Sequence, residues 1–133
     1  MKIGVDFHGF MESYPEVLKP LLEFMLSQCD HEIYVLSGPE KEIIIEDLTR
    51  LGYIQGVHYD EIFSIVDFLK KKKDPNLHQD EKGNWWTTDE NWFSSKGQFC
   101  IEEGIEVIFD DKIEYEKYLP PWVEFYRIER RKK

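Results

Sequence analysis

Long connections between five short apolar runs are the feature that most restricts how this chain can fold. The runs are residues 2–7, 32–37, 61–66, 106–109 and 122–128, and each has the length and the β-branched or aromatic content of a strand. The first three connections span about 24, 23 and 39 residues, well above the dozen or so that a parallel crossover requires. We therefore predict a mainly parallel five-stranded sheet, and the shorter last connection leaves the direction of the final strand open.

Helical periodicity in these connections predicts helices that cover the sheet. In the second and third connections, apolar residues at helical spacing end at Gly52 and Gly104, and glycine is a frequent helix stop. The first connection has a capping-box pattern at residues 13–16, but Pro20 requires that the helix either kinks or effectively starts near Lys19. Strands that alternate with helices predict an α/β fold of three layers, α/β/α and Rossmann-like.

Residues 67–91 interrupt the alternation and are predicted to form an inserted loop or a minimal cap. They are polar and rich in turn-forming residues, apart from Trp85 and Trp86. The two tryptophans fit either a small satellite packing cluster or a lid and substrate platform over a nearby site. The length fits a single domain over residues 1–133 that ends in a basic tail, residues 129–133.

Charge and hydropathy exclude several classes of protein. A net charge of −10 opposes general binding to nucleic acid, and a contact through the basic tail stays open as a separate, non-enzymatic hypothesis. No apolar run approaches the roughly 20 residues that span a bilayer, and no signal-peptide pattern is visible, so we expect a cytoplasmic protein without a membrane partner. Cys29 and Cys100 form no Cys-x-x-Cys pair and are predicted to be reduced thiols in the core.

Polar residues follow three of the predicted strands at the point where each strand ends. The first strand ends in Asp6, the second in Ser37 and Gly38, and the fourth in Asp110 and Asp111. An isolated aspartate at a strand end is often only a cap or turn former. Ligands of open parallel sheets, however, bind beyond the carboxyl ends of the strands, so three polar ends at one edge favour a binding site.

Lys96 is unusual because it lies on the apolar face of its predicted helix. Its stem could pack while the ammonium reaches water. Alternatively, its charge pairs with Asp6, with Asp110 or with a bound anion. Carboxylates, one lysine and one hydroxyl together suit a divalent cation plus a phosphate.

These residues occur in the order of the four motifs of the haloacid dehalogenase superfamily of phosphohydrolases, which the sequence resembles. The matching segments are Asp6-Phe-His-Gly9, Tyr34-Val-Leu-Ser37-Gly38, Lys96, and Ile108-Phe-Asp110-Asp111. The stretch from Lys96 to Asp111 is similar to the C-terminal half of small nucleotidase-like members. The resemblance covers most of the chain except residues 67–91 and the tail.

The resemblance implies a role for each matched position. Asp6 would be the nucleophile that becomes a phosphoaspartate, and Ser37, Gly38 and Lys96 would bind phosphate. Magnesium would be held by Asp6, Asp110, Asp111 and the backbone carbonyl of His8. The small cap implies an open cleft for a phosphorylated small molecule such as a nucleotide or a phosphosugar, and the oligomeric state stays open.

His8 departs from the family pattern, because phosphatases of this family usually carry a second aspartate there to protonate the leaving group and activate water. Histidine could replace that aspartate, since it exchanges protons near neutral pH. It could also be a neutral loop residue without a catalytic role. Two hypotheses follow: a magnesium-dependent phosphomonoester hydrolase that is slow or atypical, and a degenerate protein that binds a phosphorylated ligand or a partner without turnover.

Overall fold

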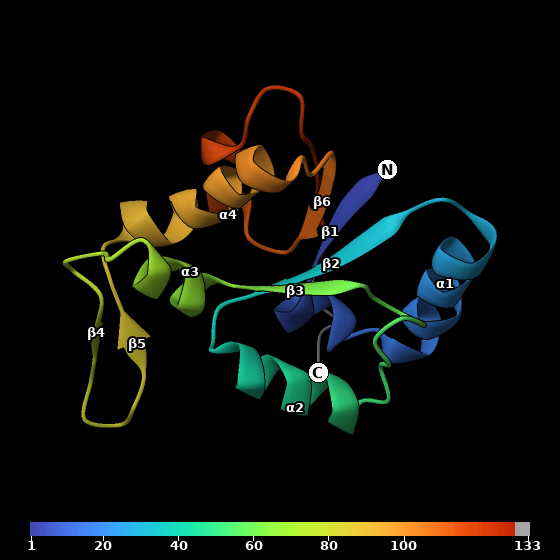
Figure 1. The fold of residues 1–133 in the computed structure, drawn as a ribbon, viewed down its shortest axis with the longest axis horizontal. Helices are drawn as coiled ribbons and strands as arrows, with labels where there is room; N and C mark the ends of the chain where they lie inside the picture. The colour runs from blue at the N-terminus through green and yellow to red at the C-terminus, as the bar shows by residue number, and fades with distance from the viewer. Residues whose placement is uncertain (130–133) are drawn as a thin grey trace.

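The computed structural model describes residues 1–129 and contains a five-stranded parallel sheet (Figure 1). Its order is β3-β2-β1-β6-β7, and all neighbouring strands are parallel. The bounds are β1 (Lys2–Asp6), β2 (Glu32–Ser37), β3 (Glu61–Ser64), β6 (Val107–Asp110) and β7 (Glu124–Arg127). The predicted sheet is therefore confirmed, the final strand included, but residues 65–66 belong to a helix and not to the third strand.

Within residues 1–129, four α-helices and two short helical turns connect the strands. They are α1 (Pro15–Gln28), α2 (Lys41–Arg50), α3 (Ile65–Lys71), α4 (Asp89–Glu103), η1 (Phe7–Met11) and η2 (Ile113–Tyr118). The predicted stops after α2 and α4 are confirmed, because Gly52 and Gly104 have φ angles of +83° and +74°, which favour glycine.

The predicted start of α1 is wrong. Tyr14 is the N-cap residue and makes no side-chain cap hydrogen bond, and Pro15 is the first helical residue. Proline suits this position because its fixed φ is helical and its missing N–H would have no partner there. The helix runs through Pro20, so the alternative start near Lys19 is also wrong.

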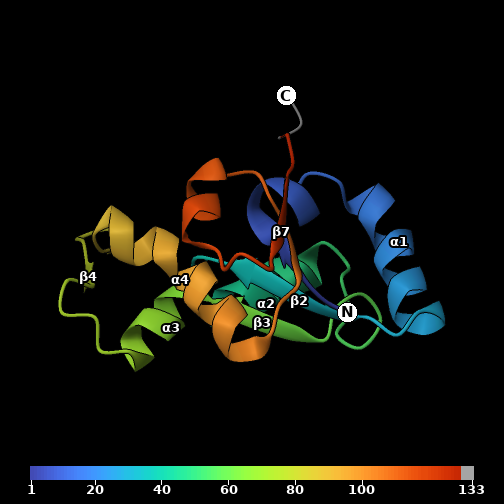
Figure 2. The same ribbon diagram turned by 90° about the horizontal axis from the view of Figure 1, so that it is seen from above.

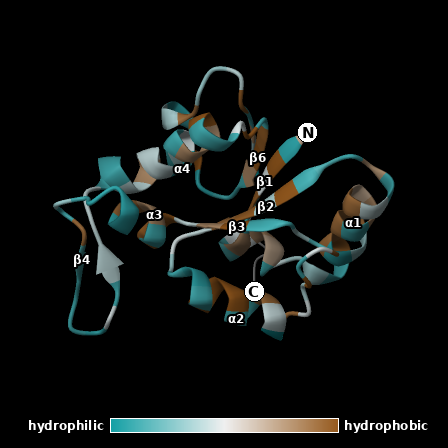
Figure 3. Ribbon diagram, in the orientation of Figure 1, coloured by the Kyte–Doolittle hydropathy of each residue, from teal (hydrophilic) through white to brown (hydrophobic). Residues whose placement is uncertain are grey.

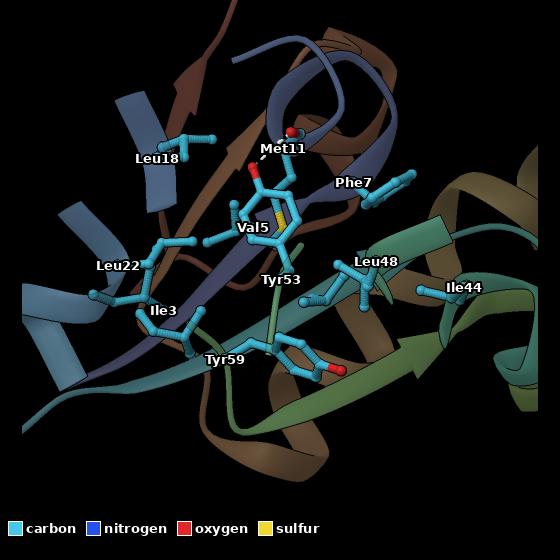
Figure 4. Close-up of a cluster of buried hydrophobic side chains, with 12 residues drawn as sticks. Ile3, Val5, Phe7, Met11, Leu18, Leu22, Ile44, Leu48, Tyr53 and Tyr59 are labelled. Atoms are coloured by element: carbon cyan, nitrogen blue, oxygen red, sulfur yellow. Dashed lines mark hydrogen bonds between the residues drawn. The ribbon is translucent and has the colours of Figure 1, made fainter. Parts of the chain in front are cut away.

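Helices cover both faces of the sheet, and a separate apolar cluster lies on each face. In β2, Ile33 and Val35 join the cluster that contains residues of α1 and α2, drawn in Figure 4. Tyr34 and Leu36 join the other cluster, with residues of α3, α4 and η2. This alternation follows from the two-residue period of a strand. Figure 3 accordingly shows brown, hydrophobic segments in the central strands.

Residues 67–91 contain more regular structure than the sequence indicates. Residues 67–71 complete α3, whose Phe68 and Leu69 are buried, and Ser64 caps this helix by accepting a hydrogen bond from the backbone N–H of Asp67 at 3.1 Å. An antiparallel hairpin follows, formed by β4 (His78–Gln79) and β5 (Trp85–Trp86). The hairpin and α1 lie at opposite ends of the molecule in both views (Figure 1, Figure 2).

Three further expectations concern the termini, the cysteines and the membrane. The basic tail was predicted over residues 129–133, of which 130–133 lie outside the described residues. Cys29 and Cys100 are both free thiols, as predicted, but only Cys100 is a core residue, because Cys29 is partly exposed. Within residues 1–129, none of the helices combines the length and the apolar character needed to cross a bilayer.

Gly97 allows α4 to pack closely on η2, which gives a testable prediction. A Cβ atom at this position would lie 2.2 Å from the backbone carbonyl oxygen of Tyr118. Alanine normally stabilises a helix interior relative to glycine, but here we expect Gly97→Ala to lower the free energy of unfolding by about 1–3 kcal/mol because the backbone must shift. Chemical denaturation tests this, with the exposed Gln98→Ala as control. A stabilised Gly97→Ala would contradict the packing.

Candidate active site at the carboxyl edge of the sheet

Three carboxylates meet at the carboxyl edge of the sheet. Asp6 ends β1 and Asp110 ends β6, its neighbour in the sheet, and Asp111 follows directly. One carboxylate oxygen of each residue lies within 4.8 Å of the others, and the cluster could hold a metal ion. The parallel register brings these positions together from residues far apart in the sequence.

Lys96 is buried against this cluster. Its Nζ atom lies 3.3 Å from Asp6 Oδ1 and donates a hydrogen bond to Asp110 Oδ2. The ammonium also lies over the ring of Tyr115, 4.0 Å from its centroid. Carboxylates and an aromatic face thus replace the water that a buried ammonium loses. The alternative in which Lys96 reaches solvent is wrong, because the residue is only 1% exposed.

Burial and neighbouring charges shift the pKa values of the groups at this site. Burial raises the pKa of Asp6 to about 8; Lys96 opposes this shift, and Asp110 and Asp111 add to it. Burial likewise raises the pKa of Asp110. Burial alone would lower the pKa of Lys96, but the nearby acidic groups outweigh it and the pKa is raised, so the ammonium stays charged. One ammonium thus contacts two of the three clustered carboxyl groups, and a divalent cation would favour the charged form of all three.

Two buried polar atoms at this edge have no hydrogen-bond partner within residues 1–129. They are Asp6 Oδ2 and Ser37 Oγ, and Ser37 ends β2, the other neighbour of β1. Buried polar atoms are rarely left without a partner, and Asp6 lines the cavity described below, so its Oδ2 atom is available to a ligand or ion there. The oxygen-rich donor set, with a free oxygen on Asp6, fits a hard cation such as Mg²⁺.

A cavity of about 530 Å³ opens at the acidic cluster. Its polar lining includes all the predicted site residues except Ser37: Asp6, His8, Gly38, Lys96, Asp110 and Asp111. Gly38 has a steric role there, because a Cβ atom at its position would lie 2.8 Å from Cζ2 of Trp92. The glycine therefore leaves room for an indole that also lines the cavity.

His8 lies in the turn that follows Asp6. Phe7 is fully buried in the core and anchors this turn, and Gly9 has a φ of +92°, which favours glycine. The His8 side chain is 40% exposed, lines the cavity and has its Nδ1 atom 3.5 Å from Glu12 Oε2. It contributes no side-chain atom to the described acidic cluster, so any contribution of His8 to a metal site would come from its backbone.

The structure brings Trp85 and Trp86, the tryptophans of the predicted lid or packing cluster, to the cavity lining. Trp85 Nε1 donates a hydrogen bond to Glu40 Oε1 at 2.7 Å, and Lys70 Nζ lies 4.4 Å from the centroid of the Trp85 ring. Trp86 Nε1 donates to Asp80 Oδ2 at 2.8 Å. The hairpin is thereby tied to α2 through Trp85 and Glu40.

Several residues in the cavity lining were not identified from the sequence. Tyr115 is buried, and its hydroxyl oxygen accepts a hydrogen bond from Trp92 Nε1 at 3.1 Å; burial raises the pKa of Tyr115. No periodic pattern singles out Tyr115, because it lies in a short 3₁₀ turn. Glu40 could have been found, since it follows β2 by three residues at the same edge of the sheet. Lys112 similarly follows Asp110 and Asp111.

Fold and site together define an α/β protein with an acidic cluster, capable of holding a metal ion, in the lining of a cavity. Comparison of the chain with protein-family models, with curated proteins and with solved structures gives no match. A function therefore has to be inferred from the residues and the geometry of the site.

Proposed function

We propose that this chain is a magnesium-dependent phosphomonoester hydrolase of the haloacid dehalogenase type, acting in the cytoplasm on a phosphorylated small molecule. One observation carries the proposal: Asp6 and Asp110 share the buried ammonium of Lys96 in the lining of a cavity. The proposed three-layer, Rossmann-like architecture is supported by the strand order β3-β2-β1-β6-β7 and by helices on both faces.

In the proposed reaction, a carboxylate oxygen of Asp6 attacks phosphorus while the bond from phosphorus to the leaving oxygen breaks. The leaving oxygen takes a proton from His8, which leaves an alcohol and an aspartyl-phosphate. A water molecule then attacks phosphorus, gives a proton to His8, and releases inorganic phosphate and the Asp6 carboxylate. A covalent intermediate of this kind divides hydrolysis into two easier steps.

The other matched residues would bind and neutralise the phosphoryl group. Ser37, Gly38 and Lys96 would contact its oxygens; Gly38 and Lys96 line the cavity, and the Ser37 hydroxyl is buried beside Gly38 without a hydrogen-bond partner within residues 1–129. Asp6, Asp110, Asp111 and the backbone carbonyl of His8 would hold Mg²⁺, which supplies positive charge beside the phosphoryl oxygens when bound.

Metal dependence is the first test of this proposal. We expect slow but measurable hydrolysis of an aryl phosphate by the purified protein with Mg²⁺, and none after treatment with a chelator. Activity should return when Mg²⁺ is restored in excess. Hydrolysis that persists at the same rate in excess chelator would contradict the proposal.

His8 favours a second candidate, a protein that binds a phosphorylated ligand without turnover. Losing a general acid or base costs about 10²- to 10⁴-fold in rate. Placing an aspartate at position 8, as the family usually has, should therefore raise the rate of hydrolysis. We expect His8→Asp to raise the rate of aryl phosphate hydrolysis by up to about 100-fold. His31→Asp is a matched control, because His31 precedes β2 at the opposite edge of the sheet. No hydrolysis by either the native protein or His8→Asp would support the binding-only candidate.

A further inference from the structure

We infer that the substrate carries a planar, uncharged ring, as a nucleoside monophosphate or an aryl phosphate does, and that Trp86 stacks on this ring. The inference rests on the proposed phosphatase function and selects among its substrates. It starts from the cavity lining, which combines the acidic cluster with the aromatic residues Trp85, Trp86, Trp92 and Tyr115. A phosphosugar offers no aromatic face to such a lining.

Of these four aromatic residues, Trp86 is the most exposed. Tyr115 is buried and packs on Lys96, and Trp92 donates a hydrogen bond to Tyr115. The ring of Trp85 already has the ammonium of Lys70 over it. Trp86 is 53% exposed while it lines the cavity, and its bond to Asp80 fixes the edge of the indole. A ring held at its edge loses less conformational freedom when it stacks on a ligand.

The charges in the lining favour a ring without a negative charge. Beside the acidic cluster the cavity holds Glu40, whose carboxylate accepts the hydrogen bond from Trp85, and the cations are Lys96 and Lys112. Mg²⁺ and Lys96 would be occupied by the phosphoryl group in the proposed reaction. A second anionic group near Glu40 would be repelled, whereas a neutral ring would not.

The size of the cavity agrees with a single ring system attached to a phosphate. Small-molecule sites typically measure about 300–1,000 Å³, and this cavity measures about 530 Å³. The β4–β5 hairpin supplies Gly83 and Asn84 to the lining as well as the two tryptophans. This hairpin therefore supplies the part of the lining that we expect to select the substrate.

The test compares substrates that differ only in the ring. Ribose 5-phosphate is set against the 5′-monophosphates of adenosine, guanosine, cytidine and uridine, in the native protein, Trp86→Ala and Trp122→Ala. Trp122 is a matched control, because it is 56% exposed and does not line the described cavity. We expect kcat/KM to be about 5- to 100-fold higher for at least one nucleotide than for ribose 5-phosphate, with most of that preference lost only in Trp86→Ala.

A binding measurement separates this inference from the proposed function. Phosphate-free nucleosides and ribose are titrated into the same three proteins by calorimetry, with no turnover required. Nucleoside binding that is lost in Trp86→Ala but not in Trp122→Ala would support the ring site even if no phosphate ester is hydrolysed. Equal kcat/KM for nucleotides and ribose 5-phosphate, or equal losses for both in Trp86→Ala, would overturn the ring inference and leave the hydrolase proposal intact. Failure of nucleosides to bind in the absence of any hydrolysis would overturn both.

Discussion

In the Asp6→Asn variant, hydrolysis of an aryl phosphate is expected to fall by at least about 10⁴-fold, while the metal-free protein becomes more stable. The loss of activity follows from the proposed role of Asp6 as nucleophile, since an amide cannot form the phosphoaspartate. The gain in stability follows mainly from the burial of Asp6, which raises the pKa of its carboxyl group; Lys96 opposes this shift, and Asp110 and Asp111 add to it. Opposite changes in activity and stability would separate a missing nucleophile from a misfolded protein.

The gain in stability depends on pH in a defined direction. Asp6 has an ordinary pKa of 3.8 and a pKa of about 8 in the folded protein. Between these values the unfolded chain has released the proton and the folded protein retains it, so Asp6 lowers stability as pH rises through the window. One pKa unit corresponds to about 1.4 kcal/mol, so we expect Asp6→Asn to add about 1–3 kcal/mol near pH 8 and almost nothing below pH 4.

Denaturant unfolding in the presence of a chelator, measured from pH 4 to pH 8, checks this prediction. Asp30→Asn is the matched control, because Asp30 precedes β2 at the opposite edge of the sheet. Asp6→Asn should have the flatter dependence of stability on pH, and Asp30→Asn should follow the native protein. A variant less stable than the native protein at pH 8 would contradict the crowding of charges at this site.

Replacing Lys96 should lower stability, unlike Asp6→Asn, and should abolish hydrolysis, as Asp6→Asn does. Lys96 is the buried cation that contacts both Asp6 and Asp110. Methionine has a similar length but no charge, so Lys96→Met leaves two buried carboxylates without their counter-ion. Breaking a buried ion pair by removing one partner costs about 3–5 kcal/mol. We also expect no measurable hydrolysis, because the proposed phosphate contact is lost.

Addition of Mg²⁺ distinguishes a lost counter-ion from lost packing in Lys96→Met. A divalent cation at the acidic cluster would restore positive charge, so Mg²⁺ should recover part of the lost stability, as measured by thermal unfolding. Lys71→Met, at an exposed position at the end of α3, is the control. It should lose no stability, and Mg²⁺ should stabilise it no more than it stabilises the native protein. A Lys96→Met protein as stable as the native one would contradict the buried ion-pair network.

The central sheet and the meeting of Asp6 with Asp110 could be predicted, because both follow from short apolar runs with long connections. Parallel strands place their carboxyl ends at one edge, so residues directly after each run had to converge. Lys96 could be singled out because a lysine on an apolar helix face needs a partner. The sequence does not decide between the possible partners of Lys96, because they depend on how α4 packs against the sheet.

The remainder of the site depends on segments with weak sequence signals. Helix α3 has only seven residues, and its exposed lysines make the segment look polar in the sequence although Phe68 and Leu69 are buried. The hairpin strands have two residues each, too short for any alternation to be visible. Tyr115 lies in a 3₁₀ turn, whose side chains follow no long-range periodicity. These are the elements that complete the cavity around the carboxylates.

Chemical trapping of the phosphoaspartate tests the proposed function most directly. Borohydride reduces an aspartyl-phosphate to homoserine, so the native protein is quenched with borohydride during turnover of an aryl phosphate with Mg²⁺ and analysed by peptide mass spectrometry. We expect homoserine at position 6 that requires both Mg²⁺ and substrate, and none in Asp6→Asn. Magnesium-dependent hydrolysis with Asp6 unmodified, or with homoserine at another aspartate, would contradict Asp6 as the nucleophile.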